Sequence, residues 1–572
     1  RKRNPKLIRF IDERMKDYLE ASYGLLVYQD DVLLTAITLG GYSWLEADML
    51  RKAMGKKIPE VMEAEKEKLI KGFIEHGKLS KENAETLWKL IEPFAAYGFN
   101  KCLTGDTRIH NPVTGELNTL VSLMNTREKV PVSALTQAHT LTKAKGSWVR
   151  ENGVKNVYRL TTRSGRTLRA TDNHPLLCFD GWRPLGKLLP GMRIATPRKI
   201  LPPEHSPVIP SHETAVLGYL LSEGNLCHPH GLYFYSTQDN EIADFTRAAL
   251  YFPNTRVTLN RSKSAVSVYV GKETQGIPNG MVVWADALEI RGKRALEKSI
   301  PHTVFSWSND SLAIFLGKLW QGDGTVSLKN TQAFYATSSE QLAHDVQHVL
   351  LRFSILSTIH TKQFRYRGTL RPGFTIVVSS TENITRLEET IGPHLIGSKQ
   401  SLLETLARMS SLRTNNLGRG TSDTIPASVL GEIHTEASSR GMSMAQLARI
   451  AGISSRLLST DVRKRGYTRA IMEKTAVALE SSTLTRHAES DIFWDEVKTI
   501  ELDGEEMTYD LSVPELENFI ANDIVVHNSH AASYGKVAYQ TAYMKANYPV
   551  EYMAALLTAD AGDVERIAIL VA

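Results

Sequence analysis

The chain has 572 residues, of which 42% are hydrophobic and 23% are charged, and its formal net charge at pH 7 is +6. This length exceeds what one hydrophobic core serves, so we expect at least three domains, with a composition typical of soluble globular protein. No apolar run approaches the ~20 residues of a membrane span, and three cysteines cannot form a disulfide framework, so we expect a cytoplasmic protein with no membrane partner. Because the chain begins at Arg1 without a signal-peptide pattern, we expect a piece of a longer protein.

The pattern of predicted elements changes several times along the chain. Residues 1–101 and residues 529–572 have apolar side chains at helical spacing, which predicts helices at both ends. Residues 102–198 and 493–526 alternate in short stretches with Gly, Asn and Pro between them, which predicts strands and turns. A proline-rich linker, a mixed α/β section to about residue 420 and a short helical section separate the two β-like stretches. The pattern therefore predicts a β unit split by a long insertion and set inside a helical unit.

The two helical ends share motifs with one family. The motifs are residues 23–30 (YGLLVYQD), 50–57 (LRKAMGKK), 94–101 (FAAYGFNK), 529–534 (SHAASY) and 548–553 (YPVEYM). They resemble the α subunit of bacterial DNA polymerase III, in which the sequence that ends here at residue 101 continues directly as that from residue 529. The resemblance implies all-α fingers segments, with primer-template DNA and other replisome subunits as partners. It also implies that the catalytic palm lies outside this fragment, so these flanks alone should not polymerise DNA.

The residues at the two junctions can support autocatalytic excision. The thiol of Cys102 can attack the carbonyl of Lys101 to give a thioester, because thiols ionise more readily than hydroxyls. Ser529 follows the insertion and offers an oxygen that can take over the acyl group. Asn528 can attack its own carbonyl through its amide nitrogen, and His527 can donate a proton to the leaving group. Each signal is weak alone, since a His-Asn-Ser tripeptide occurs in many loops.

The surrounding motifs strengthen this interpretation. They are residues 102–107 (CLTGDT), 165–175 (GRTLRATDNHP), 509–513 (YDLSV) and 518–528 (NFIANDIVVHN). These segments resemble the splicing motifs of inteins, which implies an all-β Hint-type domain that needs no cofactor. By this resemblance, His174 polarises the Lys101–Cys102 peptide. Thr171 helps to stabilise the oxyanion, a contribution of about 3–4 kcal/mol for such donors.

Two further positions are assigned by the intein resemblance. Asp510 falls where the family keeps a carboxylate that coordinates the two junctions. Glu517 stands where many relatives have His, so assistance to Asn528 cyclisation is expected to rest on His527 and water. An inactive β domain is the alternative for the whole set.

Two segments about 100 residues apart share a second pattern. Residues 216–224 (VLGYLLSEG) and 316–324 (LGKLWQGDG) are apolar helical stretches that end in a carboxylate followed by Gly. A packed pair of such helices would place Glu223 and Asp323 side by side, and paired carboxylates suit Mg²⁺, which can activate water for phosphodiester cleavage. The segments resemble the LAGLIDADG motifs of homing endonucleases, which implies a double-stranded DNA target at the intein-free host junction. Lys318 departs from the small residue usual there, so cleavage is less secure than the fold. Two core helices with acidic ends would explain the apolar pattern but not the repeat.

A smaller basic unit is expected within residues 433–480. Ser443 is predicted to cap one helix and Ser455 a second helix that runs to about residue 463. This pattern is typical of a helix-turn-helix, with four basic side chains that could face DNA: Arg456, Arg463, Lys464 and Arg465. A helical spacer remains an alternative.

The expected multidomain layout combines these predictions in six segments. They are residues 1–101 (fingers), 102–206 (first part of the splicing domain), 207–420 (α/β LAGLIDADG endonuclease), 421–487 (helix-turn-helix insert), 488–528 (second part of the splicing domain) and 529–572 (fingers). Two other hypotheses stay open. One is a polymerase DNA-binding fragment with a splicing-inert, DNA-binding insertion. The other is a hedgehog-type processing domain, which shares the β architecture but lacks a downstream half to ligate.

Overall fold

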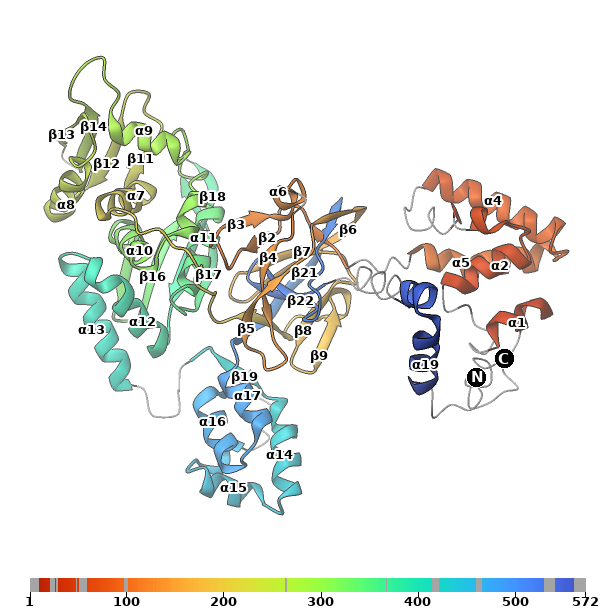
Figure 1. Cartoon of the computed structure of the whole chain (residues 1–572). Helices are drawn as coiled ribbons and strands as arrows, with labels where there is room; N and C mark the ends of the chain where they lie inside the picture. The colour runs from red at the N-terminus through yellow and green to blue at the C-terminus, as the bar shows by residue number, and fades with distance from the viewer. Residues whose placement is uncertain are drawn as a thin grey trace. The chain divides into compact units, whose positions relative to one another are not determined.

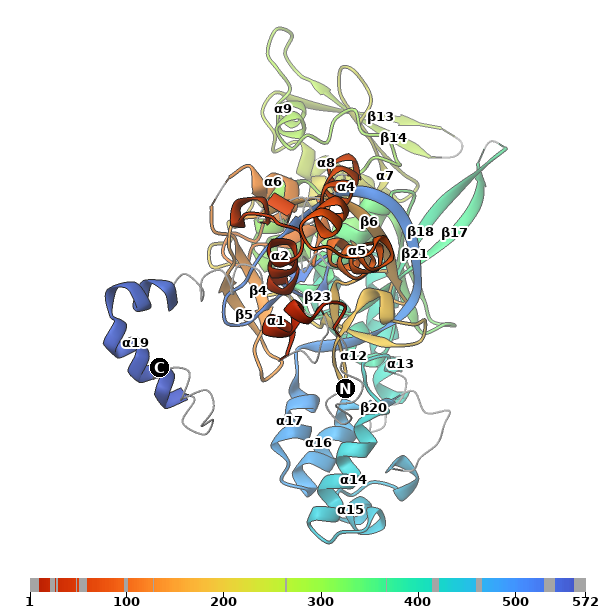
Figure 2. The same cartoon turned by 90° about the vertical axis from the view of Figure 1, so that its right-hand side faces the viewer.

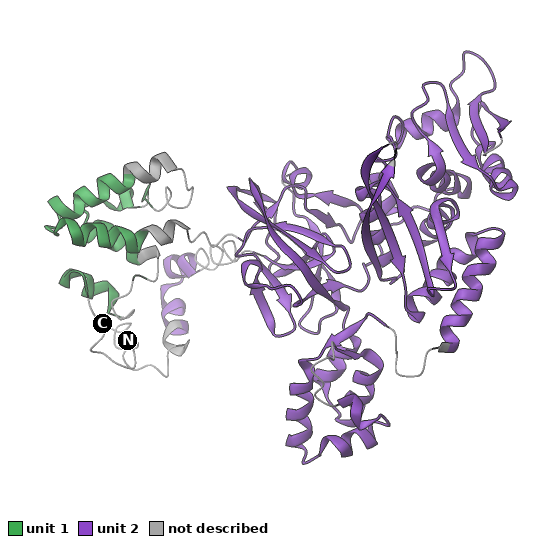
Figure 3. Ribbon diagram, turned by 180° about the vertical axis from the view of Figure 1, so that it is seen from behind, with its two compact units in different colours: residues 1–100 green, residues 101–572 purple. Residues whose placement is uncertain are grey.

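Two compact units divide the chain, residues 1–100 and residues 101–572 (Figure 3). The computed structural model describes residues 10–20, 26, 29–47, 49–50, 59–96, 101–126, 128–262, 265–366, 368–413, 421–458, 466–528 and 541–559. Among these residues, no helix is both long enough and apolar enough to cross a membrane.

The first unit is helical, as the apolar spacing predicts. Its elements are η2 (Glu13–Met15), α1 (Lys16–Leu19), α2 (Gln29–Thr38), α4 (Pro59–Glu75) and α5 (Lys81–Ala96) (Figure 1). One core unites α2, α4 and α5 through buried side chains such as Leu39, Phe73 and Ile91. Gly40 and Gly72 let the chain approach closely, since a Cβ at Gly72 would lie 2.3 Å from the Gly40 carbonyl oxygen. In the downstream flank, the described residues include α19 (Pro549–Ala559), which is also helical.

A nine-stranded sheet unites the two β-like stretches of sequence. The strands that precede the insertion are β1 (Leu103–Thr104), β6 (Arg150–Thr162), β7 (Thr167–Ala170), β8 (Pro175–Cys178), β9 (Gly181–Pro184) and β10 (Arg193–Pro197). Those that follow it are β21 (Ile492–Asp510), β22 (Asn518–Ala521) and β23 (Ile524–His527). The order is β1-β7-β6-β21-β10-β8-β23-β22, with β9 beside β8, so strands from both sides of the insertion are interleaved. This arrangement confirms that one β unit is split by the insertion.

The long strand β21 connects the parts of this sheet. It pairs with β6, β10 and β1, and three bulges along the β6 pairing let it bend. A two-residue turn, Asn522–Asp523, joins β22 to β23, and both residues have positive φ (47° and 55°). Asn and Asp tolerate this conformation well, and such turns match the twist of a hairpin.

Shorter elements pack around the nine-stranded sheet. They are β2 (Arg108–His110), β3 (Leu117–Thr119), α6 (Leu120–Met124), β4 (Pro131–Leu135), β5 (Leu141–Lys145) and η3 (Leu185–Lys187). β2 pairs with β3, and β4 pairs with β5. The core is made largely by the apolar inner faces of the strands, including Leu160, Leu176 and Val526.

The mixed α/β section contains an internal repeat. Its first half has α7 (Ser211–Glu223), β11 (Gly224–Asn225), β12 (Leu232–Ser236), α8 (Asp239–Ala249), β13 (Thr255–Arg261), β14 (Val266–Lys272) and α9 (Gly280–Ala287). Its second half has η4 (His302–Ser306), α10 (Asn309–Asp323), β15 (Gly324–Ser327), β16 (Gln332–Thr337), α11 (Glu340–Leu351), β17 (Ser357–Tyr366), β18 (Thr369–Val378) and α12 (Thr381–Ile391). The sheets have matching orders, β11-β12-β14-β13 and β15-β16-β18-β17, and the β13–β14 and β17–β18 hairpins project from the body (Figure 2). We call residues 207–413 the two-sheet body; it ends with η5 (Gly392–His394) and α13 (Ser398–Arg413).

The short helical section folds around a core of its own. It contains β19 (Thr424–Pro426), α14 (Val429–Ser439), α15 (Met444–Ile450), η6 (Ser455–Leu458), β20 (Gly466–Thr468), α16 (Arg469–Ala478) and α17 (Ser482–Glu489). Ser443 forms a capping box with Gln446, which confirms the predicted start of α15. Ser455 begins a 3-10 helix that ends at Leu458, and the rest of the expected second helix lies outside the described residues.

Candidate functional sites

The upstream junction is held by a turn of the main sheet. The backbone N–H of Cys102, which is the nitrogen of the Lys101–Cys102 peptide, donates to Thr171 Oγ1 at 3.2 Å. The backbone N–H of Thr171 donates to the Cys102 carbonyl oxygen at 3.1 Å. His174 closes the same turn, because its N–H donates to the Thr171 carbonyl oxygen at 3.0 Å. The Thr171 hydroxyl therefore contacts the nitrogen of the Lys101–Cys102 peptide, and the oxyanion role that the intein resemblance implies for it stays a prediction.

The Cys102 thiol is buried and faces two polar side chains of β6. Lys155 Nζ donates to its Sγ at 3.1 Å, and Asn152 Nδ2 donates at 3.3 Å. Burial raises the pKa of the thiol, and the Lys155 ammonium opposes that rise. Lys155 and Asn152 could not be assigned from the sequence, because they reach Cys102 only once β6 and β1 are joined through their shared partners β7 and β21.

His174 is fully buried beside the upstream peptide. Burial lowers the pKa of its imidazole to about 3, and the positive charges of Lys101 and His527 act in the same direction. The backbone of Lys101 and Cys102 lies against the ring and works the other way. Among the described residues, neither ring nitrogen completes a hydrogen bond of normal geometry. The imidazole is therefore neutral near pH 7.

The downstream junction lies at the end of β23. The backbone N–H of Asn528 donates to the Glu517 carbonyl oxygen at 2.9 Å, and its side-chain Nδ2 donates to the Val513 carbonyl oxygen at 3.1 Å. His527 Nδ1 lies 2.8 Å from the oxygen of the Asn528 carbonyl group, whose carbon cyclisation would attack. The Trp182 ring packs edge-on against the His527 ring, with 4.6 Å between the ring centroids. No sequence motif pointed to this neighbour. Ser529 lies outside the described residues.

Two carboxylates act on the upstream residue Lys101. Burial lowers the pKa of the Lys101 ammonium, while the negative charges of Glu517 and Asp510 oppose this. Asp510 ends β21 and also raises the pKa of the Cys102 thiol. Glu517, with a φ of 56°, thus binds Asn528 through its backbone and acts on Lys101 through its charge. The residue that replaces the usual His therefore lies between the two junctions.

The repeated acidic helices meet in the two-sheet body. Glu223 ends α7 and Asp323 ends α10. Burial raises the pKa of the Asp323 carboxyl group, and the Glu223 charge raises it further. A neighbouring carboxylate raises the pKa of a carboxyl group because two like charges at close range repel each other. The structure therefore brings together the two side chains that the sequence pattern selected.

Two lysines occupy equivalent places beside these carboxylates. Lys298 Nζ donates to the carbonyl oxygens of Leu220, Ser222 and Gly224 at 3.0, 2.8 and 3.0 Å, which caps the end of α7. Lys399 Nζ donates to the carbonyl oxygens of Trp320, Gln321 and Gly322, which caps the end of α10. Burial lowers the pKa of Lys298 to about 8, against the charges of Asp323 and Glu223. Neither lysine was assigned a role from the sequence.

The packing of α7 on α10 accommodates Lys318. A Cβ at Gly218 would lie 2.6 Å from the Phe315 carbonyl oxygen and 2.8 Å from the Lys318 Cβ, so glycine supplies the close approach from the other helix. The Lys318 side chain turns away, and its Nζ pairs with Asp244 at 2.8 Å. Lys318 therefore leaves the helix contact intact.

The carboxylate pair fits a hard divalent cation. Mg²⁺ commonly binds one or two carboxylates and completes its shell with water and substrate phosphates. Among the described residues, no group of three or more His, Cys, Asp or Glu side chains converges on a metal position. Glu223 and Asp323 would be the protein ligands, and the ion would supply activation of water.

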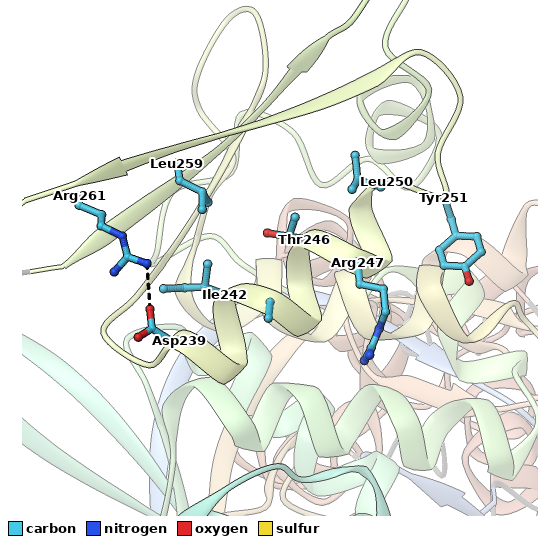
Figure 4. A pocket seen from close by; sticks show the side chains of 9 residues that line it. Asp239, Ile242, Thr246, Arg247, Leu250, Tyr251, Leu259 and Arg261 are labelled. Carbon is cyan, nitrogen blue, oxygen red and sulfur yellow. Dashed lines mark hydrogen bonds and ion pairs between the residues drawn. The ribbon is translucent and has the colours of Figure 1, made fainter.

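Two other regions, the basic residues near η6 and a cavity beside α8, contain fewer reactive side chains. Arg456 is exposed on η6, whereas the other three basic residues proposed to face DNA, Arg463, Lys464 and Arg465, lie outside the described residues. An open cavity of about 750 Å³ lies between α8 and β13, closed at one end by the 3.1 Å Asp239–Arg261 ion pair (Figure 4). It contains neither a junction residue nor one of the paired carboxylates, so we place the sites elsewhere.

Comparison with known proteins identifies two matched regions. Residues 113–528 match the family described as the Intein splicing domain, and residues 1–77 match the Bacterial DNA polymerase III alpha subunit finger domain. The chain is 34% identical over 442 residues to the replicative DNA helicase DnaB of Rhodothermus marinus, a match that covers 75% of this chain and 46% of the helicase. It is 41% identical over 100 residues to the DNA polymerase III subunit alpha of Treponema pallidum, covering 18% of this chain and 8% of that protein.

A solved structure of I-DmoI in complex with DNA and Mn matches 32% of this chain and 96% of its own, at 14% identity and a TM-score of 0.24. The chain spans about half the length of the curated helicase that it matches. The splicing-domain match covers well over half of the chain. The chain therefore belongs to the intein splicing domain family.

Proposed function

We propose that residues 102–528 excise themselves and join Lys101 to Ser529 by a peptide bond. The observation that carries this proposal is that both ends of the insertion enter one buried site. Cys102 lies at the start of β1, and Asn528 follows the end of β23. The neutral His174 lies beside the upstream peptide, and the charge of His527 helps to lower its pKa. A single reaction could therefore be coordinated across both junctions.

The first step uses the residues around Cys102. The thiol sulfur attacks the Lys101 carbonyl carbon, the C–S bond forms, and the C–N bond to Cys102 breaks. The thiol proton passes to the departing nitrogen, and the neutral His174 ring, which lies against this peptide, polarises it for the attack. Lys155 and Asn152 stabilise the thiolate at the moment of attack. Thr171 holds the scissile N–H in place.

The later steps transfer the acyl group and release the insertion. The Ser529 hydroxyl attacks the thioester, forms a C–O bond and returns a thiol at Cys102. Asn528 Nδ2 then attacks its own carbonyl carbon and frees the amine of Ser529. His527 donates to that carbonyl oxygen through Nδ1 and so favours the attack. The freed amine displaces the ester oxygen, which completes the peptide bond.

The matches support an insertion in a polymerase host. Residues 102–528 make up about three quarters of the chain, the same share that matches a helicase, while residues 1–77 match a polymerase finger domain. We assign residues 1–101 and 529–572 to the host fingers, which would bind primer-template DNA and other replisome subunits. Residues 102–206 and 488–528 would form the splicing domain, residues 207–420 the nuclease and residues 421–487 the helix-turn-helix insert.

The paired carboxylates favour a second activity, site-specific cleavage of double-stranded DNA. Glu223 and Asp323 would hold Mg²⁺, and the basic lysines beside them would balance charge on a phosphate. The target would be the host gene that lacks the insertion. Arg456, Arg463, Lys464 and Arg465 would add phosphate contacts from the helical insert.

A gel assay tests the splicing proposal. The purified precursor should convert with time into two products, the excised insertion and the joined flanks. The Cys102→Ala/Asn528→Ala double variant serves as the control and should remain intact. A wild-type chain that also remains intact would contradict the proposal and favour a splicing-inert insertion.

A further inference from the structure

The turn of the β22–β23 hairpin is held by hydrogen bonds to residues of β2 and β7. Asn522 Oδ1 accepts the backbone N–H of Arg108 at 2.7 Å, and Asn522 Nδ2 donates to the Thr167 carbonyl oxygen at 3.1 Å. From this turn β23 runs directly to His527 and Asn528. A four-residue strand is about 13 Å long, so a shift at the turn moves the residues at its other end.

Helix α11 of the two-sheet body holds the same turn from the other side. His348 Nδ1 lies 2.8 Å from Asp523 Oδ1, and both side chains are largely buried. Arg108, whose N–H binds Asn522, forms an ion pair with Asp345 at 2.8 Å. His348 and Asp345 lie one turn apart on α11 and therefore reach the hairpin together.

Several positive or hydrogen-bonding groups compensate the buried Asp523 carboxylate at this contact. Burial alone would raise the pKa of Asp523, but His348, Arg166 and Arg108 more than offset this and lower it to about 2. Asp523 is therefore charged at all physiological pH values and needs its partners. Loss of one partner would leave a buried carboxylate less well compensated.

The helix itself is firmly seated in the two-sheet body. Ser339 caps its start, and the Ser339 hydroxyl also donates to the Lys298 carbonyl oxygen. Asp345 Oδ2 accepts the backbone N–H of Ile300 at 2.9 Å. Gln347 Nε2 reaches the Ser164 carbonyl oxygen of the β6–β7 turn at 2.9 Å. α11 can therefore act as a fixed support for the hairpin.

We propose that His348 and Asp345, which belong to the inserted two-sheet body, are positioning residues for cleavage at Asn528. They fix the turn of the β22–β23 hairpin, and β23 carries His527 and Asn528 into the site. The inference rests on the proposed splicing reaction. It assigns the inserted body a part in that reaction besides any action on DNA. The upstream step uses the contacts of Cys102 with Thr171, Lys155 and Asn152, to which neither His348 nor Asp345 contributes, and should not need this support.

The test separates the two junctions in the full chain. In a Cys102→Ala background, only cleavage at Asn528 is measured; in an Asn528→Ala background, only dithiothreitol-induced cleavage at Lys101 is measured. His348→Ala and Asp345→Asn should each slow cleavage at Asn528 on the order of tenfold, because small misplacement of reacting groups is costly. Cleavage at Lys101 should stay within about twofold of its parent.

Two matched variants distinguish positioning from general destabilisation. His348→Asn places an amide nitrogen where Nδ1 lies, so it should restore much of the lost rate. His434→Asn makes the same change at an exposed position of α14, outside this cluster, and should leave cleavage at Asn528 unchanged.

The outcomes separate this inference from the splicing proposal. Equal loss at both junctions, or no loss at Asn528, would overturn the positioning role while leaving splicing itself in place. The splicing proposal, and this inference with it, would be overturned by two results together: the Cys102→Ala parent never cleaves at Asn528, and the wild-type chain never splices.

Discussion

At the scale of single residues, burial and nearby charge decide which groups can react. Cys102 is buried, which disfavours its thiolate, and Lys155 supplies the opposing charge at 3.1 Å. His174 is fully buried and its imidazole stays neutral, which suits a group that polarises the neighbouring peptide. The local motif of Thr171 and His174 could be recognised from sequence because four residues of one turn hold it. Lys155 could not, because its approach to Cys102 depends on β21, which is more than 300 residues further along the chain.

Lys155→Met tests the role of the ammonium beside the thiol. Removal of the positive charge leaves burial unopposed, so the Cys102 pKa should rise and less thiolate should exist at a given pH. We expect dithiothreitol-induced cleavage to slow on the order of tenfold at pH 7 and its pH profile to move to higher pH. Lys145→Met, at an exposed position of β5, is the control. An unchanged pH profile in Lys155→Met would contradict this role.

Asn528→Ala tests the downstream nucleophile. Without the side-chain amide, no succinimide can form, so a branched ester or upstream cleavage product should accumulate. His527→Ala should only slow the step, because His527 contacts the oxygen of the attacked carbonyl group and does not supply the nucleophile. Mass spectrometry of the products distinguishes these species. Normally joined product from Asn528→Ala would show that the assigned nucleophile is wrong.

At the scale of elements, the two acid-ended helices depend on close packing. The repeat of helix, two strands, helix and two strands could be predicted only in part, because the sequence pattern marks α7 and α10 but not the matching sheet orders. The pattern also treated Lys318 as a defect of the helix contact. Gly218 faces Lys318 and removes the clash, which depends on the register of two helices and is invisible in either motif alone. The contact between α11 and the β22–β23 hairpin was likewise beyond sequence reasoning.

Gly218→Ala tests the helix contact. The added Cβ would meet the Phe315 carbonyl oxygen and the Lys318 Cβ, so the helices must separate. We expect a loss of about 1–3 kcal/mol of stability, as for other overpacked cores, measured by thermal unfolding. Gly431→Ala is the matched control, since a Cβ there meets nothing within 4 Å on α14. Equal melting temperatures for Gly218→Ala and the wild type would refute close packing at this point.

At the scale of the whole molecule, two proposed chemistries occupy separate sites on one chain. The splice junctions lie at the ends of β1 and β23, whereas Glu223 and Asp323 lie at the ends of α7 and α10. The nested order of elements was predictable from sequence, because the change from helical to β periodicity is strong at both junctions. The second helix expected after Ser455 stays a prediction beyond Leu458, where η6 ends, because residues 459–465 lie outside the described residues.

Glu223→Gln and Asp323→Asn test whether these sites are independent. Each variant removes a carboxylate charge from the proposed Mg²⁺ site, so cleavage of a duplex should stop while splicing continues at the wild-type rate. The duplex joins the codons for residues 98–101 to those for residues 529–531, and binding should weaken steeply with salt. Binding without cleavage by the wild type would show that nuclease activity has been lost. No specific binding at all would refute the DNA target.

The most direct test of the splicing account is the covalent structure of the joined flanks. After incubation of the wild-type precursor, peptide mass spectrometry across the junction should find Lys101 linked to Ser529 by a peptide bond. The excised insertion should begin at Cys102 and end in a succinimide or its hydrolysis product at residue 528. Flanks that separate but never join, or an insertion whose ends lie at other residues, would contradict the account.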